Sequence, residues 1–313
     1  NTMNWIYTIY FFLPNFKNYG LPGKVLHKSL EMILKRIFDR TVPSYLKRTQ
    51  KDQGSGLNSL PRDTKYIVSL TSFPGRIDQI WISIECILRQ TQKPDAIYLW
   101  LAEDQFPDKV LPKNLTDLQA RGLTIKFCDE DLKAHKKYYY SMLLHKDAYI
   151  ITVDDDLYYD KYLLENLFKI HSKNPTLIAT NRAHKIRFNK DKKVDLYKNW
   201  EHVTTDNEPS HLIMQTGGCG TLYPPSVLIE TAFDRKLIKD LCFYADDVWL
   251  KMMSILSDRQ VVTNSKYNKD HLSISTTQRE KLVKTNVLTG GNDLQVKNCI
   301  DYFDLDLYNY QNK

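Results

Sequence analysis

The sequence predicts an α/β domain with a mostly parallel sheet and helices on both faces. Two observations predict it: strand-like and helix-like segments alternate between residues 66 and 180, and five of the six residues 148–153 are apolar or aromatic. A run of that kind is typical of a strand buried on both faces. Alternating strands and helices favour parallel pairing, because each parallel connection needs a crossover segment.

Short apolar runs indicate the strands, and longer segments with helical periodicity indicate the helices. Strands are expected at 66–70, 96–101, 123–127, 148–153 and 177–180, and helices at 77–90, 133–144, 162–171, 225–233 and 245–256. Residues 181–210 interrupt this pattern with a polar, charged segment. We expect a surface loop there, and long loops are also where lids and acceptor sites occur.

Most of the positive charge lies in the first fifty residues. The chain of 313 residues has a net charge of +7, and eight Lys or Arg against two acidic residues give residues 1–50 a charge of +6. The nearly neutral remainder argues against nucleic-acid binding by the main domain. A basic segment of this kind more often meets an anionic surface.

Residues 24–40 have an amphipathic pattern, with Leu26, Ile33 and Ile37 among the apolar residues on one arc of the predicted helix. This helix could pack on the main domain or lie on anionic lipid, and the two arrangements are compatible. The aromatic run 5–13 is too short to span a bilayer, and no basic region precedes it as in a signal peptide. We therefore expect a cytoplasmic protein, peripheral on the inner face of the cell membrane.

Composition divides the chain into three parts. We expect a basic, aromatic and amphipathic N-terminal segment at 1–50, a linker rich in Gly, Ser and Asn at 51–63, and the main domain at 64–313. The five cysteines are odd in number, widely spaced and without a CxxC pair. This argues for reduced thiols and against a disulfide framework or a zinc knuckle.

Three carboxylates, Asp154 to Asp156, follow the apolar run 148–153. Open α/β sheets place their ligands at the carboxyl ends of such strands. Two carboxylates one residue apart can hold a hard divalent cation there, and the cation can hold a diphosphate. The alternative is a solvated turn whose aspartates cap a helix.

Further motifs occur in a defined order around these aspartates. They are, along the chain, the residues 69–76 after the first strand, Asp154–Asp156, the glycine-rich turn 217–220, Asp246–Asp247 and His271. This order resembles the nucleotide-sugar glycosyltransferases of the GT-A (Rossmann-like) fold, of the family 2-like type that builds bacterial surface polysaccharide. The resemblance covers roughly residues 65–275 and leaves the basic N-terminal segment unexplained.

The resemblance implies a metal site at the three aspartates. Asp156 would ligate Mn²⁺ or Mg²⁺, Asp154 would contact the ribose or a metal-bound water, and His271 would be a third metal or diphosphate ligand. The cation would neutralise the leaving diphosphate. Asp155 belongs to the same donor-binding element and faces the other way, by the alternation of side chains along an extended chain.

The resemblance also implies a donor pocket. Thr71, Phe73 and Arg76 match the residues that surround the nucleotide base, although Arg76 could instead be a surface residue at a helix N-terminus. Asp129 could accept a hydrogen bond from the pyrimidine N3–H, or cap a helix. Gly218 lies in the turn whose backbone approaches donor and acceptor, since glycine has no Cβ to intervene; a tight turn alone would use the same residue.

Asp247 matches the catalytic base of inverting enzymes, which deprotonates the acceptor hydroxyl as it attacks the anomeric carbon. Asp246 replaces the Glu usual in the family and would orient the acceptor. An acid at a helix N-terminus is also a common helix-stabilising residue, and a retaining enzyme would not need this base. Lys136 and Lys137 could steer the diphosphate, but the sequence favours a solvated helix face for them.

These expectations together describe a metal-dependent hexosyltransferase. It would move a sugar from a nucleoside-diphosphate sugar, a UDP-sugar first of all, to a glycan or a lipid-linked acceptor in cell-surface polysaccharide synthesis. The alternatives are another metal-dependent phosphotransfer enzyme such as a nucleotidyltransferase, and a non-catalytic sugar-binding protein of the same fold. A nucleotidyltransferase favours a glycine-rich basic first loop, where this chain has Gly75 and Arg76 alone.

Overall fold

A computed structural model describes most of the chain. The described residues are 7, 8, 10, 11, 20–203, 205–264, 266, 267, 270–275 and 291–311. The aromatic run predicted at 5–13 therefore lies largely outside the described residues.

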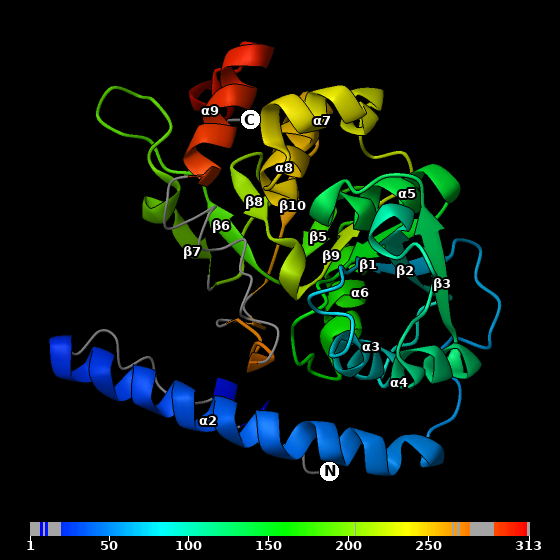
Figure 1. The fold of residues 1–313 in the computed structure, drawn as a ribbon. Helices are drawn as coiled ribbons and strands as arrows, with labels where there is room; N and C mark the ends of the chain where they lie inside the picture. The colour runs from blue at the N-terminus through cyan, green and yellow to red at the C-terminus, as the bar shows by residue number, and fades with distance from the viewer. Residues whose placement is uncertain are drawn as a thin grey trace.

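A seven-stranded sheet forms the centre of the α/β body (Figure 1). Its strands are β1 (Tyr66–Thr71), β2 (Ala96–Ala102), β3 (Leu123–Cys128), β4 (Tyr149–Thr152), β5 (Ile178–Thr180), β9 (Thr221–Tyr223) and β10 (Val261–Val262), in the order β10-β5-β9-β4-β1-β2-β3. Strand β9 runs antiparallel to both of its neighbours, and the other neighbouring pairs are parallel. The predicted mostly parallel sheet is confirmed.

The strand order reverses between β1 and β4. From β1 the chain proceeds outward through β2 and β3, and then returns to place β4 on the other side of β1. The two strands are parallel, with Ser69 opposite Thr152, so the loops after both strands leave the same edge of the sheet. Connections that diverge from this point leave a crevice at the carboxyl ends of β1 and β4, which is where open α/β sheets bind ligands.

Helices cover both faces of the sheet, as predicted (Figure 1). The helices α3 and α6 contribute to one apolar core, and α5, α7, α8 and α9 to another. Their bounds are α3 (Ile80–Leu88), α4 (Lys113–Thr116), α5 (Lys136–Leu144), α6 (Leu163–Lys173), α7 (Arg235–Cys242), α8 (Asp246–Leu256) and α9 (Gly291–Phe303). All five cysteines are free and buried.

One predicted helix is not present in the structure. The prediction of a helix at 225–233 is wrong, because a short 3-10 turn occupies Glu230–Phe233 and α7 begins after it. Asp234 sets this start, since its side chain accepts hydrogen bonds from the N–H groups of Lys236 and Leu237 as an N-cap does.

The segment 181–210, expected to be a surface loop, contains two strands. Strands β6 (Ala183–Lys185) and β7 (Glu201–Val203) pair antiparallel, and β8 (Ile213–Gln215) completes a second, three-stranded sheet in the order β7-β6-β8. These short strands contribute apolar side chains to the same core as α8. The polar sequence between β6 and β7 is only the connection, which is why composition alone suggested a loop.

The N-terminal helix is longer than the predicted 24–40. Helix α2 (Gly20–Thr49) runs along one side of the body and continues through Pro43 (Figure 1). Phe38, Val42 and Leu46 on its second half are fully or almost fully buried in the core that contains α3. Among the described residues, no helix is both long and apolar enough to cross a bilayer.

A buried ion-pair network joins α2 to the body. The Glu85 carboxylate on α3 is fully buried and accepts hydrogen bonds from Arg89 and from Arg121, each at 2.6 Å. Arg89 also donates to the hydroxyl of Thr49 at 2.8 Å and to the carbonyl of Leu46 at the end of α2. One carboxylate thus holds two guanidinium groups, one of which fixes the helix end.

We expect Glu85→Gln to destabilise the fold by about 3–5 kcal/mol, because it leaves two largely buried guanidinium groups without their charge partner. Urea unfolding measures this effect. The matched control is Asp117→Asn, which removes the charge of a carboxylate paired with Lys113 on the surface. That variant should change the free energy of unfolding by less than about 1 kcal/mol. Equal effects of the two substitutions would contradict the prediction.

Candidate active site

A cleft of about 1680 Å³ opens at the carboxyl ends of β1 and β4. Its size exceeds that of a pocket for one drug-sized ligand, about 300–1000 Å³, and leaves room for two substrates. Ten of the eleven site residues predicted from the sequence line it, and Asp129 does not. The ten are Thr71, Phe73, Arg76, Asp154, Asp155, Asp156, Gly218, Asp246, Asp247 and His271.

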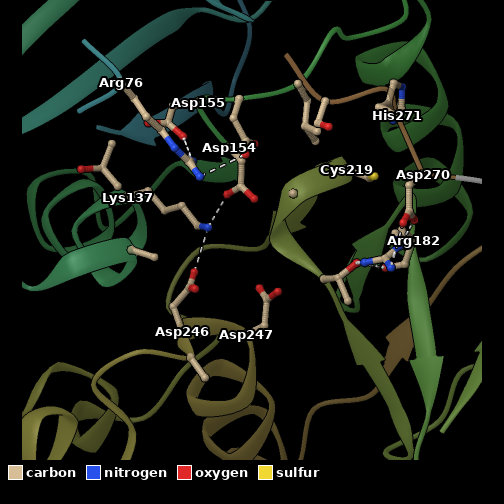
Figure 2. Close-up of a pocket in the computed structure, with 18 of the residues that line it drawn as sticks. Arg76, Lys137, Asp154, Asp155, Arg182, Cys219, Asp246, Asp247, Asp270 and His271 are labelled. Atoms are coloured by element: carbon tan, nitrogen blue, oxygen red, sulfur yellow. Dashed lines mark hydrogen bonds and ion pairs between the residues drawn. The ribbon is translucent and has the colours of Figure 1, made fainter. Parts of the chain in front are cut away.

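The three consecutive aspartates have different partners, and Figure 2 labels the first two of them. Asp155 is buried and accepts hydrogen bonds from the Ser72 hydroxyl and from Arg76, both at 2.6 Å. Asp156 lies 3.2 Å from the second terminal nitrogen of Arg76. The Asp154 side chain is 37% exposed, so it is the most accessible of the three to a ligand in the cleft.

Lys137 stands between the aspartate run and the start of α8. Its Nζ lies 2.7 Å from Asp154 and 2.8 Å from Asp246, and its side chain is only 3% exposed (Figure 2). Burial by itself lowers the pKa of this amine, but the two carboxylates more than offset burial and raise the pKa well above its usual value. The predicted solvated helix face is therefore wrong for Lys137, and also for Lys136, which is buried against Asp131.

The glycine-rich turn brings the aspartate run close to α8. The Gly217 N–H donates to Asp247 at 2.8 Å, and a Cβ atom on Gly218 would lie 2.8 Å from the Asp154 carboxylate. The Tyr159 hydroxyl accepts from the Asp154 N–H and donates to the Gly218 carbonyl, both at 2.7 Å. A larger residue at position 218 would have to displace this carboxylate, so the glycine leaves the Asp154 side chain in its observed position.

The two acids at the start of α8 have pKa values shifted in opposite directions. Burial raises the pKa of Asp247 to about 7, the negative charge of Asp246 adds to this, and Lys137 opposes it. Burial also acts to raise the pKa of Asp246, but its contact with Lys137 outweighs burial and lowers it. Because the two pKa values lie apart, Asp246 stays ionised, whereas Asp247 can exchange a proton near neutral pH.

The end of β1 and the loop that follows it supply another part of the cleft lining. Arg76 is largely buried and stacks over the Phe73 ring, with its guanidinium carbon 5.5 Å from the ring centroid. Thr71 donates a hydrogen bond to the carbonyl of Trp100 at 2.8 Å. The sequence allowed two places for Arg76, the donor pocket or the surface at a helix N-terminus. The structure excludes the surface position.

His271 lies apart from Asp154 and Asp155, near Asp270 and Arg182 (Figure 2). Its ring packs among aromatic side chains, with Tyr267 at 4.9 Å and Tyr159 at 5.6 Å between centroids. Burial lowers its pKa to about 3, and neither ring nitrogen has a hydrogen-bond partner among the described residues. The described part of the chain contains no cluster of three or more His, Cys, Asp or Glu placed to hold a metal, so the predicted set of three ligands is not assembled.

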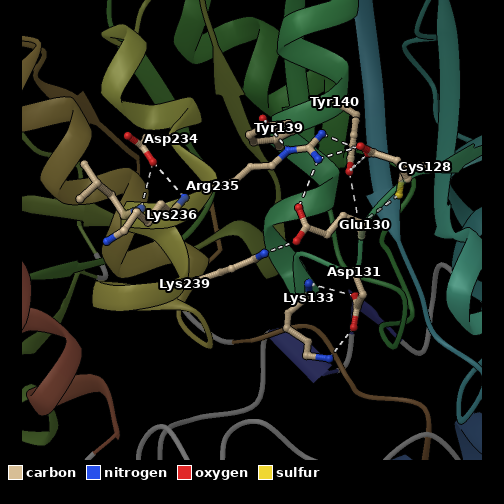
Figure 3. A network of polar contacts seen from close by, with 12 residues as sticks. Cys128, Glu130, Asp131, Lys133, Tyr139, Tyr140, Asp234, Arg235, Lys236 and Lys239 are labelled. Atoms are coloured by element: carbon tan, nitrogen blue, oxygen red, sulfur yellow. Dashed lines mark hydrogen bonds and ion pairs between the residues drawn. The ribbon is translucent and has the colours of Figure 1, made fainter.

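Asp129 lies outside the cleft. Its carboxylate is 63% exposed, accepts from Arg235 of α7 at 2.7 Å, and accepts from the Tyr140 hydroxyl at 2.7 Å. These hydrogen bonds lower its pKa. In the same network, Lys239 and Arg235 pair with Glu130 (Figure 3). The alternative role of Asp129 as a helix cap is not seen among the described residues, because α7 packs against this loop and Arg235 pairs with the carboxylate. The contact of Asp129 with the nucleotide base stays a prediction.

Sequence reasoning missed Arg182, which also lines the cleft. It lies two residues after the end of β5 and pairs with Asp270, and its guanidinium donates to the Thr216 hydroxyl at 3.2 Å. The signal was available, since Arg182 stands at the carboxyl end of a predicted strand just as Asp154 does.

Comparison with known proteins gives distant structural similarities. No family model and no curated protein matches the sequence. The S. aureus TarS 1–349 structure matches with 11% identity and a TM-score of 0.39, over 65% of this chain and 59% of that chain. TarS 1–349 in complex with UDP-GlcNAc matches with 12% identity and a TM-score of 0.41, over 67% and 60%. The 4-diphosphocytidyl-2C-methyl-D-erythritol synthase structure matches with 14% identity and a TM-score of 0.40, over 67% and 93%. The chain thus spans about three fifths of the TarS chain, and its family is not fixed.

Proposed function

We propose that the protein is a metal-dependent, inverting glycosyltransferase that moves a sugar from a UDP-sugar to a glycan or lipid-linked acceptor. One observation carries the proposal. Lys137 joins Asp154 after β4 to Asp246 at the start of α8, and Asp247 stands next to them with a pKa near neutrality. This arrangement supports the proposal, because it combines carboxylates suited to a cation, a fixed positive charge and a carboxyl group that can take up a proton. All of them lie where the strand order reverses, which is where open α/β sheets bind ligands.

The donor set fits Mg²⁺ or Mn²⁺. Mg²⁺ sites commonly use one or two carboxylates, with substrate phosphates and waters as the remaining ligands, rather than a complete cage of protein ligands. Asp154 and Asp156 are such a pair, and the glycine at 218 leaves the Asp154 oxygen uncovered by a side chain. When bound, the cation supplies Lewis-acid stabilisation of the leaving diphosphate.

The residues of the chain have distinct roles in this proposal. Lys137 and Arg76 donate to phosphate oxygens and balance the charge of the aspartates. Asp247 is held through one oxygen by the Gly217 N–H, and the carboxylate takes the proton of the acceptor hydroxyl. The acceptor oxygen then bonds to the anomeric carbon as the bond from that carbon to the diphosphate breaks, and the configuration inverts.

Nucleotide binding is the first test. We expect UDP or a UDP-sugar to raise the melting temperature by a few degrees when Mn²⁺ is present, since a ligand at about 100 times its Kd stabilises by about 2.7 kcal/mol. A thermal-shift and calorimetric screen of UDP, GDP, CDP, their sugars and the nucleoside triphosphates, each with and without Mn²⁺, measures this. Metal-dependent binding of a triphosphate alone would favour a nucleotidyltransferase, and no response to any nucleotide would contradict the proposal.

A further inference from the structure

Helix α2 exposes an apolar side to solvent. The exposed fraction is 48% for Leu26, 51% for Met32, 53% for Ile33 and 40% for Ile37, and Val25 reaches 60%. A helical repeat of 3.6 residues places these side chains over one broad arc. Scattered apolar residues are normal on protein surfaces, but several on successive turns of one helix mark an interaction site.

The contacts of α2 with the rest of the protein fix its orientation, so the exposed apolar side cannot rotate into the core. Phe38, Val42 and Leu46 are buried on the opposite arc, and the Tyr158 hydroxyl donates to Asp39 at 2.9 Å. Arg89 fixes the last turn through the buried carboxylate network described above. The exposed apolar side is therefore a fixed feature of the fold.

Exposed cations accompany the apolar side. Six Lys or Arg of α2 are exposed, whereas its two acids, Glu31 and Asp39, are partly buried and hydrogen-bonded to His27 and Tyr158. The six are Lys24, Lys28, Arg36, Arg40, Lys47 and Arg48. Apolar side chains interleaved with basic ones are the combination that binds an anionic bilayer surface. A second copy would bring one basic helix against another, which like-charge repulsion opposes.

We propose that α2 docks the protein on an anionic lipid surface through Leu26, Met32, Ile33 and Ile37 together with the neighbouring cations. The apolar side chains enter the headgroup region, and the cations attract anionic lipid. The helix lies in the plane of the surface and does not cross it.

The same helix forms part of the cleft wall. Lys28, Met32 and Lys35 line the cleft that holds Asp154 and Asp156, and Met32 belongs to both the exposed side and the wall. Docking therefore brings the cleft mouth to the lipid surface. Resting on the proposed function, we infer that the acceptor is lipid-held and enters beside α2.

Vesicle co-sedimentation tests the docking. The full chain should bind vesicles that contain phosphatidylglycerol and not vesicles of phosphatidylcholine alone, and salt should weaken the binding. The double variant Ile33→Glu, Ile37→Glu should bind at least tenfold more weakly, since it removes apolar burial and repels anionic lipid. Arg36→Gln with Arg40→Gln should weaken binding about 25-fold, at about 5-fold for each charge near the surface.

Controls of the same chemistry lie elsewhere on the surface. Leu294→Glu on α9 introduces a charge at a side chain that is 60% exposed, and Lys297→Gln removes an exposed charge of that helix. Both should leave vesicle binding unchanged, and the α2 variants should retain the melting temperature because their side chains are exposed. Equal binding by the α2 variants, equal loss in the controls, or a dimer that Ile33→Glu dissociates would overturn the proposal. Nucleotide binding without vesicles is measured separately, so failure of docking and failure of the donor binding that the proposed function requires are distinguishable.

Discussion

Asp247→Asn is expected to lower kcat by about 10²–10⁴-fold, the usual contribution of a positioned general base. The amide still accepts the Gly217 N–H, so the turn and the cleft keep their shape. Nucleotide affinity should therefore remain within a few-fold of wild type, because Asp247 is not one of the carboxylates proposed for the cation. Single-turnover sugar transfer and calorimetry of nucleotide binding measure the two quantities. The control is Asp240→Asn on the exposed side of α7, which should affect neither.

The pH dependence of sugar transfer by the wild-type protein provides a second test of Asp247 as the general base. Burial first, and then the charge of Asp246, raise the pKa of this carboxyl to about 7. The base form is present above that pH and is lost as the pH falls through it, so kcat/KM should decrease about tenfold per pH unit on the acid side. A rate that is flat down to pH 5, or an Asp247→Asn variant with full turnover, would refute the assignment of the base.

The fold was predictable because its signals are local. The buried run 148–153 and the alternation of strands with helices specify a parallel sheet, and the acids that follow β4 mark its ligand edge. The strands β6 and β7 were not predictable, since each is three residues long and β6 pairs with β7 and β8, which both lie well after it in the sequence. Strands that short have too few residues to show a period of two.

The position of a site residue was predictable where the end of a strand determines it. It was not predictable where the packing of helices against each other determines it. Arg182 and Asp154 both follow strands, so topology brings both to the cleft. Asp129 also follows a strand, yet α7 supplies Arg235 and takes its carboxylate out of the cleft. Lys137 was misjudged because a run of polar and aromatic residues hides which face of α5 is buried; the structure shows that its charge is compensated by Asp154 and Asp246.

Replacing either proposed metal ligand should abolish metal-dependent nucleotide binding. Asp154→Asn and Asp156→Asn each remove one of the two carboxylates proposed to hold the cation. Because loss of residues that merely support a ligand already reduces metal affinity about 10–100-fold, loss of a ligand should weaken it by at least about 100-fold. Calorimetric titration of UDP with and without Mn²⁺ measures the change, and residual binding without metal should persist through Arg76 and Lys137.

Asp155→Asn is the informative comparison, because it changes the same chemical group in the same run. Asp155 is buried against Ser72 and Arg76, and its side chain is much less exposed than that of Asp154. Its substitution weakens a hydrogen bond to a charged group and should reduce the free energy of unfolding by about 1.5–3 kcal/mol. Nucleotide binding by the folded Asp155→Asn protein should still depend on metal. If Asp155→Asn instead removed metal dependence while Asp154→Asn and Asp156→Asn kept it, the cation would have to lie on the Arg76 side of the loop. The proposed division of the three carboxylates into two ligands and one structural anchor would then be wrong.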